Sequence, residues 1–303
     1  MNLSQTAKSL AWVASHPERK AHPVKFPLRV LRWEWCRMTG TPVRLPLFDF
    51  VIQARPSDGV GRLICYFGDR ADKLFAFMKG YLKPGMTFVD VGANIGSHTL
   101  HGARLVADTG RVFSFEADPE TFSLLKENVR LNCVGNAVLW NQCLSNKSGT
   151  VIFNRNANSA RSSLLHPGDS QMTLSASALD DLLPLGQPID LLKIDVEGAD
   201  YLVLDGARRI FANAPPRVVV IEVTSCSGEI KDFLLSHAYR FYRFDESRSA
   251  LIEVESPVFE TYAVHDRARQ ELSTLEIIPL VDNAPSTNLT GQRLTSPASA
   301  RPA

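Results

Sequence analysis

The chain has 303 residues, of which 45% are hydrophobic and 21% are charged, as is typical of a soluble globular protein with enough apolar material for a core. This length allows one large domain or two small ones. No apolar run approaches about 18 residues, so we expect no transmembrane segment. The first 30 residues lack the pattern of a secretory signal, and the five scattered cysteines show no Cys-x-x-Cys spacing. These features argue against a disulfide scaffold or a zinc site and favour a reducing, cytoplasmic location.

The charge is distributed unevenly along the chain. Residues 1–45 carry eight Lys and Arg against two Glu, and residues 283–303 carry two Arg and no acid. Because the whole chain has a net charge of +1, the body from 46 to 282 carries −7. Binding to the phosphates of a nucleic acid requires a basic surface, so we expect no nucleic acid partner.

Residues 1–80 are expected to form an N-terminal extension. Its first part, 1–45, is basic, contains four prolines, and carries Trp12, Trp33 and Trp35 among the Lys and Arg residues. This part is interpreted either as a solvated segment packed loosely on the domain, or as a helical arm. Such an arm would contact a membrane surface or an anionic or lipid-linked substrate.

Two further elements complete this extension. Alternating apolar runs between Val43 and Tyr66 flank Ser57-Asp58-Gly59, a pattern that predicts a β-hairpin with its turn at these three residues. Apolar residues at helical spacing then predict a helix from Asp72 to Tyr81, which Pro84-Gly85 ends.

The stretch Thr87–Thr99, TFVDVGANIGSHT, predicts a buried strand, a sharp turn and the start of a helix. The strand ends near Asp90, the turn runs from Gly92 to Gly96, and the helix extends from Ser97 to Ala107. Glycines in the turn allow the backbone to approach a ligand closely, because they carry no Cβ. This arrangement is typical of the nucleotide-binding corner of a doubly wound α/β sheet.

Two kinds of nucleotide compete for this turn. A dinucleotide-binding domain has the pattern G-x-G-x-x-G, but counting from Gly92 its second and third glycine positions hold Asn94 and Ser97. Those glycines admit a pyrophosphate, so their absence indicates a ligand without one. The carboxylate of Asp90 also suits a ligand that bears an amino group. We therefore favour S-adenosylmethionine, with other nucleotides or a purely structural turn as the alternatives.

Alternating strands and helices follow the glycine turn. They predict a doubly wound, mostly parallel sheet with helices on both faces, in a domain that spans 81–282. We expect antiparallel strands over 241–264 at the C-terminal edge of this sheet, and a disordered tail over 283–303. The predicted strands after the glycine turn are Val112–Phe115, Ala137–Leu144, Thr150–Phe153, Ile189–Asp195 and Arg217–Ile221.

Most of the predicted strands, including the one before the glycine turn, end at or near a polar residue. They are Asp90, Glu116, Asn146, Asp195 and Glu222. Ligands of open α/β sheets lie beyond the carboxyl ends of the strands, and like charges gathered there without a ligand would repel one another. A polar, cationic ligand explains such a cluster better than a purely structural role.

Two of these residues have specific predicted contacts. Glu116 lies 24 residues after Gly92, near the usual distance for the acid that binds the ribose hydroxyls. Asn146 is placed to hydrogen-bond an adenine edge, with a simple turn asparagine as the alternative. The predicted cofactor-binding residues are Asp90, Gly92, Asn94, Gly96, Glu116 and Asn146.

The predicted catalytic residues are Asp195 and Glu197, for contact with a substrate hydroxyl or removal of its proton. Their alternative roles are orientation of Lys193 and capping of the helix that starts near Gly198.

Two histidines are further candidates for the base. His98 lies just inside the glycine turn and His265 follows the last predicted strands, although an unassigned histidine is more often structural. The oxygen ligands of Asp195, Glu197 and Asp200 are of the kind that holds a divalent ion, but nothing else in the sequence requires one, and we assign no metal.

Three segments of the chain share a family pattern: DVGANIG at Asp90–Gly96, FEADP at Phe115–Pro119, and DLLKIDVEGA at Asp190–Ala199. They resemble the FkbM family of S-adenosylmethionine-dependent methyltransferases, over roughly residues 85–245. Asn146 departs from the related enzymes, which often have an adenine-binding Asp at this position.

The resemblance implies a Rossmann-like class I methyltransferase fold and S-adenosylmethionine as the methyl donor. It also implies O-methylation of a hydroxyl on a sugar, glycolipid or secondary metabolite, so that the partner is a small-molecule or glycan acceptor. The alternatives are a non-catalytic nucleotide-binding or partner-docking module and a nicotinamide-dependent oxidoreductase.

Overall fold

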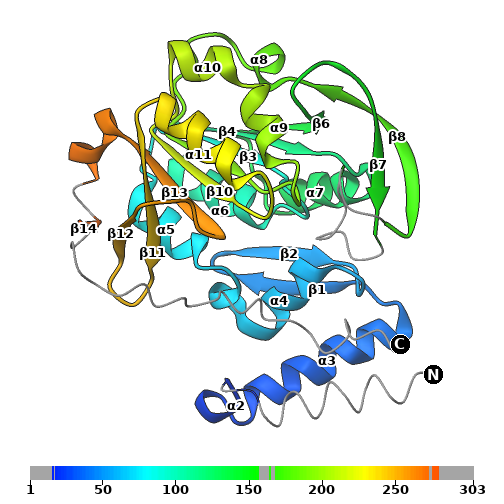
Figure 1. Ribbon diagram of the computed structural model, residues 1–303. Helices are drawn as coiled ribbons and strands as arrows, with labels where there is room; N and C mark the ends of the chain where they lie inside the picture. The colour runs from blue at the N-terminus through cyan, green and yellow to red at the C-terminus, as the bar shows by residue number, and fades with distance from the viewer. Residues whose placement is uncertain (1–15, 17, 157–163, 165–167, 273–274, 280–303) are drawn as a thin grey trace, which may run out of the picture.

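A nine-stranded β-sheet forms the centre of the protein in the computed structural model (Figure 1), which describes residues 16, 18–156, 164, 168–272 and 275–279. The strand order is β14-β12-β11-β13-β10-β9-β3-β4-β5. These strands are β3 (Thr87–Val91), β4 (Arg111–Glu116), β5 (Ala137–Asn141), β9 (Leu191–Ile194), β10 (Val218–Glu222), β11 (Tyr239–Asp245), β12 (Ala250–Val254), β13 (Glu260–His265) and β14 (Glu276–Ile278).

The strands β3, β4, β5, β9 and β10 are parallel to one another. Strand β13 is antiparallel to both β10 and β11, and β12 is antiparallel to β11. The predictions of a mostly parallel sheet and of antiparallel strands over 241–264 are thus confirmed, although β13 lies inside the sheet rather than at its edge. The strand order reverses between β3 and β9, and the crevice at such a reversal is where open α/β sheets bind ligands.

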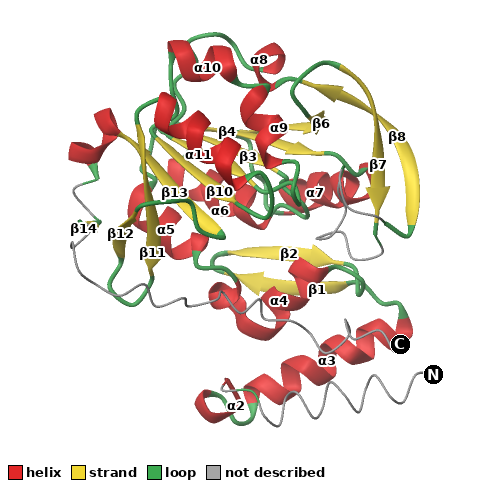
Figure 2. Cartoon of the chain, viewed as in Figure 1, coloured by secondary structure: helices red, strands yellow, loops and turns green. Residues whose placement is uncertain are grey.

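Helices cover both faces of the sheet (Figure 2). Successive residues of a strand point to opposite faces, so that Phe88 packs against α5 and α6 while Val89 packs in the cluster of α9, α10 and α11. Both faces are therefore apolar, as expected for a buried parallel sheet. The helices of this domain are α5 (Leu74–Tyr81), α6 (Ser97–Val106), α7 (Pro119–Leu131), α8 (Leu179–Leu182), α9 (Asp200–Asp205), α10 (Arg208–Asn213) and α11 (Ser227–Ser236), with the 3-10 helix η3 (Asp266–Glu271) near the end.

The N-terminal extension contains a hairpin, but not at the predicted turn. Strands β1 and β2 pair antiparallel across Phe48 and Asp49, and the segment after Ser57-Asp58-Gly59 is a helix. Residues 60–67 are apolar at consecutive as well as alternate positions, which suits a helix buried on several sides rather than a half-exposed strand. The elements of the extension are α2 (Glu18–Ala21), α3 (Lys25–Thr39), β1 (Val43–Leu47), β2 (Phe50–Ala54), α4 (Gly59–Phe67) and the 3-10 helix η1 (Gly68–Ala71).

A second, three-stranded sheet lies beside the end of β5. The predicted strand over 137–144 is divided at Gln142, because β5 ends at Asn141 and the next residues form β6. The sequence prediction also missed β8, which pairs with both β6 and β7. The strands of this sheet are β6 (Cys143–Leu144), β7 (Gly149–Arg155) and β8 (Ser170–Ser177).

The expected domain boundary between residues 80 and 81 falls inside α5. This helix belongs to the core of the sheet domain, where Phe77 packs on Tyr262 and the Tyr81 hydroxyl donates to the carbonyl of Asp190 at 3.0 Å. The predicted tail over 283–303 lies outside the described residues.

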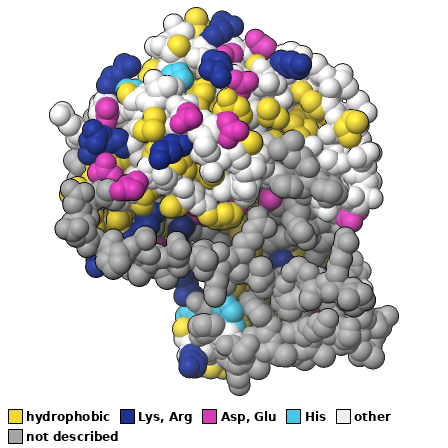
Figure 3. Space-filling view, viewed as in Figure 1, with side chains coloured by type: hydrophobic (Ala, Val, Ile, Leu, Met, Phe, Trp, Pro, Cys, Tyr) yellow, Lys and Arg dark blue, Asp and Glu magenta, His cyan; other side chains and the backbone are white. Residues whose placement is uncertain are grey.

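Charges are mixed on one face of the sheet domain. On the face shown in Figure 3, Lys and Arg side chains lie among Asp and Glu side chains. Within the described residues, no helix combines the length and the apolar character needed to cross a bilayer.

Asn128 of α7 and Asn132, which follows the end of this helix, hold the hairpin against the sheet domain. The buried side chain of Asn128 accepts from the N–H of Gln53 at 2.8 Å and donates to the carbonyls of Gln53 at 3.0 Å and Ile95 at 2.8 Å. One turn later, Asn132 exchanges the same pair of bonds with Val51, at 2.8 and 2.7 Å. The two amide groups thus pair with the open edge of β2 as a neighbouring strand would.

Replacing Asn128 with Ala should destabilise the protein, because three hydrogen bonds are lost and buried backbone groups are left without partners. We expect Asn128→Ala to lower the free energy of unfolding by about 2–4 kcal/mol, measured by chemical denaturation. The control is Asn213→Ala, since Asn213 is exposed and donates only to the carbonyl of Arg209 in its own helix. Equal losses in the two variants would contradict the role of Asn128.

Candidate active site

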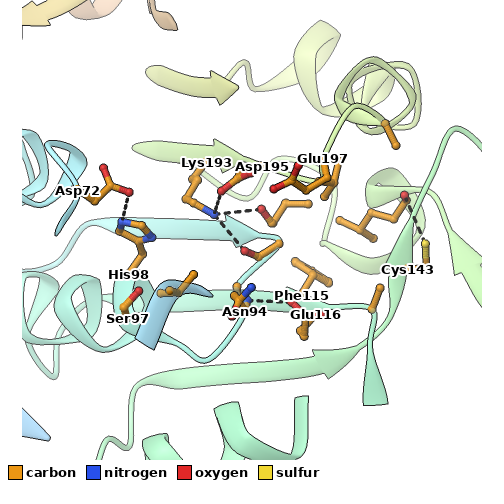
Figure 4. A pocket seen from close by; sticks show the side chains of 18 of the residues that line it. Asp72, Asn94, Ser97, His98, Phe115, Glu116, Cys143, Lys193, Asp195 and Glu197 are labelled. Atoms are coloured by element: carbon orange, nitrogen blue, oxygen red, sulfur yellow. Dashed lines mark hydrogen bonds and ion pairs between the residues drawn. The ribbon is translucent and has the colours of Figure 1, made fainter. Parts of the chain in front are cut away.

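A cavity lies at the carboxyl ends of β3, β4 and β9, beneath α4 of the extension. Figure 4 shows its main polar side chains, which come from the three strand ends, from α6 and from Asp72 before α5. The reversal of strand order between β3 and β9 therefore borders this cavity.

The glycine turn lies at the floor of this cavity. Gly92 and Gly96 have φ of 77° and 93°, a region that favours glycine. A Cβ on Gly92 would collide with the carbonyl oxygen of Asp195, and one on Gly96 would lie 2.5 Å from the Cδ1 of Leu125. Packing within the protein therefore explains both glycines, rather than the predicted close approach to a ligand. Gly92 and Asn94 line the cavity, whereas Gly96 is not among the residues that line it.

Glu116 ends β4 as predicted and lines the cavity. Its carboxylate accepts the backbone N–H groups of Asn94 at 2.8 Å and Asp118 at 3.0 Å, and so joins the glycine turn to the start of α7. Burial disfavours the charged form and, against these two hydrogen bonds, raises the pKa of Glu116 to about 7. The group therefore titrates near neutral pH.

Asp90 is not at the mouth of the cavity, in contrast to its predicted position. Its side chain is fully buried, accepts from the Thr99 hydroxyl at 2.7 Å, and lies 3.2 Å from the Nζ of Lys193. Asp90 and Lys193 are directly opposite each other on the parallel strands β3 and β9. A buried carboxylate requires a partner, and the opposite strand supplies it, so Asp90 faces the interior.

Lys193 is the cation at the centre of the site. Its Nζ also lies 3.6 Å from the carboxylate of Asp195 and donates to the carbonyl of Gly92 at 3.1 Å. Burial by itself disfavours the ammonium, but the charges of Asp90 and Asp195 outweigh this effect and raise the pKa of Lys193. The side chain therefore stays charged and holds the strand ends and the glycine turn together.

Asn146, the predicted adenine contact, is not among the residues that line the cavity. Its side-chain amide donates to the carboxylate of Asp205 at 3.2 Å. Because β5 ends at Asn141, the residues that reach the cavity from this strand end are Gln142 and Cys143. The polar pair Asn141-Gln142 interrupts the apolar run over 137–144. It indicates in the sequence that the strand ends before Leu144.

Asp195 and Glu197, the predicted catalytic residues, both line the cavity. Glu197 has a φ of 53°, an uncommon conformation that is often found at functional sites. Their carboxylate oxygens and one of Glu222 lie within 4.8 Å of one another. Asp200 is not part of this group, because its carboxylate accepts the N–H groups of Val196 and Gly198 at the start of α9.

His98 meets an acid that the sequence analysis did not identify. Its Nε2 lies 3.2 Å from the carboxylate of Asp72, and its ring packs on Phe75 at 4.7 Å between centroids. Burial opposes ionisation of Asp72, but the contact with His98 and the N–H of Leu74 lower its pKa. Both His98 and Asp72 line the cavity (Figure 4). His265 does not, since its ring accepts from the N–H of Arg267.

Apolar side chains close the cavity at two ends. Val60, Leu63 and Ile64 of α4 cover the end near His98, and Phe115 and Leu144 belong to the end near Glu116. The alternating apolar runs between Val43 and Tyr66 favour strands, so the local sequence does not place a helix over the cavity.

The residues present fit S-adenosylmethionine, which is cationic at its sulfonium. Among the described residues that line the cavity, one is a lysine, Lys193, and four carry carboxylates, which are Asp72, Glu116, Asp195 and Glu197. With this donor bound, Glu116 would accept from the ribose hydroxyls, and the apolar side chains near it would contact the adenine ring. Metal chemistry is not required for this fit.

Comparisons with known proteins agree with the pattern of this site. The profile of the FkbM methyltransferase domain matches residues 90–241. Hexuronic acid methyltransferase AglP from Haloferax volcanii is 29% identical over 136 residues, which cover 44% of this chain and 54% of the relative. Methyltransferase sdnD from Sordaria araneosa is 31% identical over 153 residues, which cover 39% of this chain and 59% of the relative. The chain thus spans between half and two thirds of these curated relatives.

A solved structure of the same family is also similar to this chain. It is the methyltransferase FkbM from Methylobacillus flagellatus KT, which has 15% sequence identity and a TM-score of 0.42, with 67% of this chain and 53% of that chain covered. The family profile itself spans half of the present chain and includes the glycine turn, Glu116 and the segment Asp190–Ala199. The chain therefore belongs to the FkbM methyltransferase family.

Proposed function

We propose that this protein transfers the methyl group of S-adenosylmethionine to a hydroxyl of a sugar, glycolipid or secondary metabolite. One observation carries the proposal: a single cavity runs from Glu116, where a ribose would bind, to the Asp72–His98 pair beneath α4. A donor and an acceptor can therefore meet inside the same enclosed space. The name of one relative, a hexuronic acid methyltransferase, supports an acceptor of the sugar class.

Glu116 and the residues around it would hold the donor. Glu116 accepts from the ribose hydroxyls, while the backbone of Gly92 and Asn94 lines the floor of the site. Asp195 and Glu197 place negative charge beside the cationic part of the donor. When bound, S-adenosylmethionine supplies a methyl group that its sulfonium already activates.

The protein then has two tasks, which are alignment and proton removal. Alignment of the two reactants inside a closed cavity can contribute about 7–11 kcal/mol to the barrier reduction. For proton removal we assign the general base to His98, because Asp72 orients its ring and stabilises the imidazolium that forms. Asp195 and Glu197 would contact the acceptor hydroxyl and position it.

Calorimetry separates this function from its alternatives. Titration of the pure, folded protein with S-adenosylhomocysteine should give saturable binding, and titration with NAD should give none. Binding of NAD alone would favour an oxidoreductase. Binding of S-adenosylhomocysteine without methyl transfer to a broad panel of hydroxyl compounds would favour a non-catalytic module.

The acceptor panel should contain neutral sugars, hexuronic acids, glycolipids and an RNA oligonucleotide, each incubated with methyl-labelled donor. We expect no transfer to the RNA, because the body of the chain from 46 to 282 carries −7 and its charges are mixed on the face seen in Figure 3. Labelled RNA would contradict this part of the proposal.

The substitution Glu116→Ala should weaken the binding of S-adenosylhomocysteine. The loss of hydrogen bonds to a charged group is worth about 1.5–3 kcal/mol, which corresponds to roughly a 10- to 150-fold increase in Kd by calorimetry. Glu120→Ala is the control, since Glu120 is exposed and pairs with Arg155 and Arg55 outside the cavity. An unchanged Kd in Glu116→Ala would show that Glu116 does not bind the ribose.

Donor binding should also depend on pH through Glu116. Because its pKa in the folded protein is raised to about 7, the carboxyl group is partly protonated at neutral pH, and only the ionised form accepts two ribose hydrogen bonds. Affinity should rise as pH increases, by about tenfold between pH 6 and pH 8, in calorimetric titrations. Glu116→Gln should remove most of this dependence, and an identical pH profile in the variant would contradict the assignment.

Replacement of His98 should slow methyl transfer without loss of the donor. We expect His98→Gln to lower kcat by about a hundred- to ten-thousandfold, with Asp72→Asn less severe, while the Kd for S-adenosylhomocysteine changes little. His237→Gln, at the end of α11 outside the cavity, is the control and should retain full activity. If donor binding fails instead, the Asp72–His98 pair binds the methionine end of the donor. If Asp195→Asn alone abolishes turnover, the base is Asp195.

A further inference from the structure

Helix α3 exposes a line of apolar residues along one side. They recur every three or four positions and so share one helical face, and each is between 47% and 65% exposed. This α3 stripe consists of Val24, Leu28, Leu31, Trp35 and Met38.

The opposite side of α3 already supplies the contact with the rest of the protein. Phe26, Val30 and Trp33 are each 1% exposed and belong to the core of the extension. An ordinary surface helix has one apolar face, which this buried side provides. The α3 stripe is thus a second apolar face, and continuous apolar surface of this kind marks an interaction site.

The exposed charged side chains beside the α3 stripe are positive. Lys25, Arg29 and Arg32 are exposed on its flank. The acid of this helix, Glu34, is buried and bonded to Arg37 at 2.7 Å, so it does not offset them at the surface. An apolar face with Trp and Leu beside Lys and Arg is the pattern of helices that lie in the interface of a membrane.

We propose that the α3 stripe docks on an anionic lipid surface, with its apolar residues among the acyl chains and the adjacent cations at the headgroups. The charge pattern disfavours two other occupants. A second copy of the chain would bring the two sets of cations together. Residues 1–15 contain Lys8 and no acid, so they carry no complementary charge.

Docking at this face would place the cavity near the lipid surface. Helix α4 lies between α3 and the sheet domain (Figure 1). The two helices are in contact, because a Cβ atom added to Gly61 of α4 would lie 3.3 Å from the ring of Trp33 of α3. Helix α4 presents Val60, Leu63 and Ile64 to the cavity. An acceptor attached to a lipid would then have a short path to the site, but the docking itself does not depend on the proposed activity.

Co-sedimentation of the full chain with vesicles tests the proposal. We expect binding to vesicles of phosphatidylglycerol and phosphatidylcholine, weak or absent binding to pure phosphatidylcholine, and release at high salt. Leu28→Ser/Leu31→Ser should weaken binding at least tenfold. Lys25→Gln should weaken it by about fivefold on the anionic vesicles, because each cation near the surface contributes separately.

The control is Leu235→Ser, which changes a leucine of α11 that is 49% exposed, and it should bind vesicles as the unchanged chain does. Circular dichroism and the Tm establish that each variant is folded, and S-adenosylhomocysteine titration establishes that its cavity is intact. The proposal is overturned if the full chain binds neither vesicle, or if Leu28→Ser/Leu31→Ser binds normally. It is also overturned if sedimentation velocity shows a dimer that this double variant abolishes, since the α3 stripe would then join two copies.

Discussion

The buried ion pair between Lys193 and Asp90 is the interaction on which the candidate site depends. It joins β3 to β9 at the reversal of strand order, where the cavity opens. Lys193 also donates to the carbonyl of Gly92 and lies beside Asp195, so one ammonium holds the glycine turn and two carboxylates in place. A charge this deeply buried is tolerated only when its partners and hydrogen bonds compensate for lost hydration.

Two parts of the chain form the cavity, one inside the FkbM domain and one that precedes it. Its floor comes from the strand ends inside the FkbM domain, which the family profile matches at 90–241. Its roof comes from earlier residues, among them Val60, Leu63 and Asp72. The extension therefore shapes the space that an acceptor would occupy, and Asn128 fixes this extension to the glycine turn by its bonds to β2 and Ile95. Under the proposed function, donor binding and acceptor choice would depend on separate segments.

The α3 stripe is a further functional surface, in addition to the floor and the roof of the cavity. Helix α3 packs on α4, and α4 covers the cavity. A surface that binds α3 would therefore lie near the part of the cavity where an acceptor would bind. Three of the eight Lys and Arg residues of 1–45, which are Lys25, Arg29 and Arg32, lie on the exposed flank of α3. Residues 1–45 carry the positive charge, whereas the body is acidic.

Local sequence was sufficient for the central elements. The strand, turn and helix over 87–107 follow from a buried apolar run, two glycines and a helix start, all of which act over a few residues. The same is true of Glu116, whose place at the end of β4 follows from the apolar run before it, and of Asp118, which caps α7 with Pro119 at its first turn. The family pattern lies in these segments, so fold class and family were predictable.

The tertiary structure decided how these side chains are used. Asp90 faces inward because Lys193, far away in sequence, lies opposite it on the neighbouring strand. Asn146 misses the cavity because the chain leaves the main sheet after Asn141 and pairs elsewhere. The meeting of Asp72 with His98 likewise requires the extension to fold over the sheet. Strand register and the packing of distant segments set these contacts, and neither leaves a signal within a short stretch of sequence.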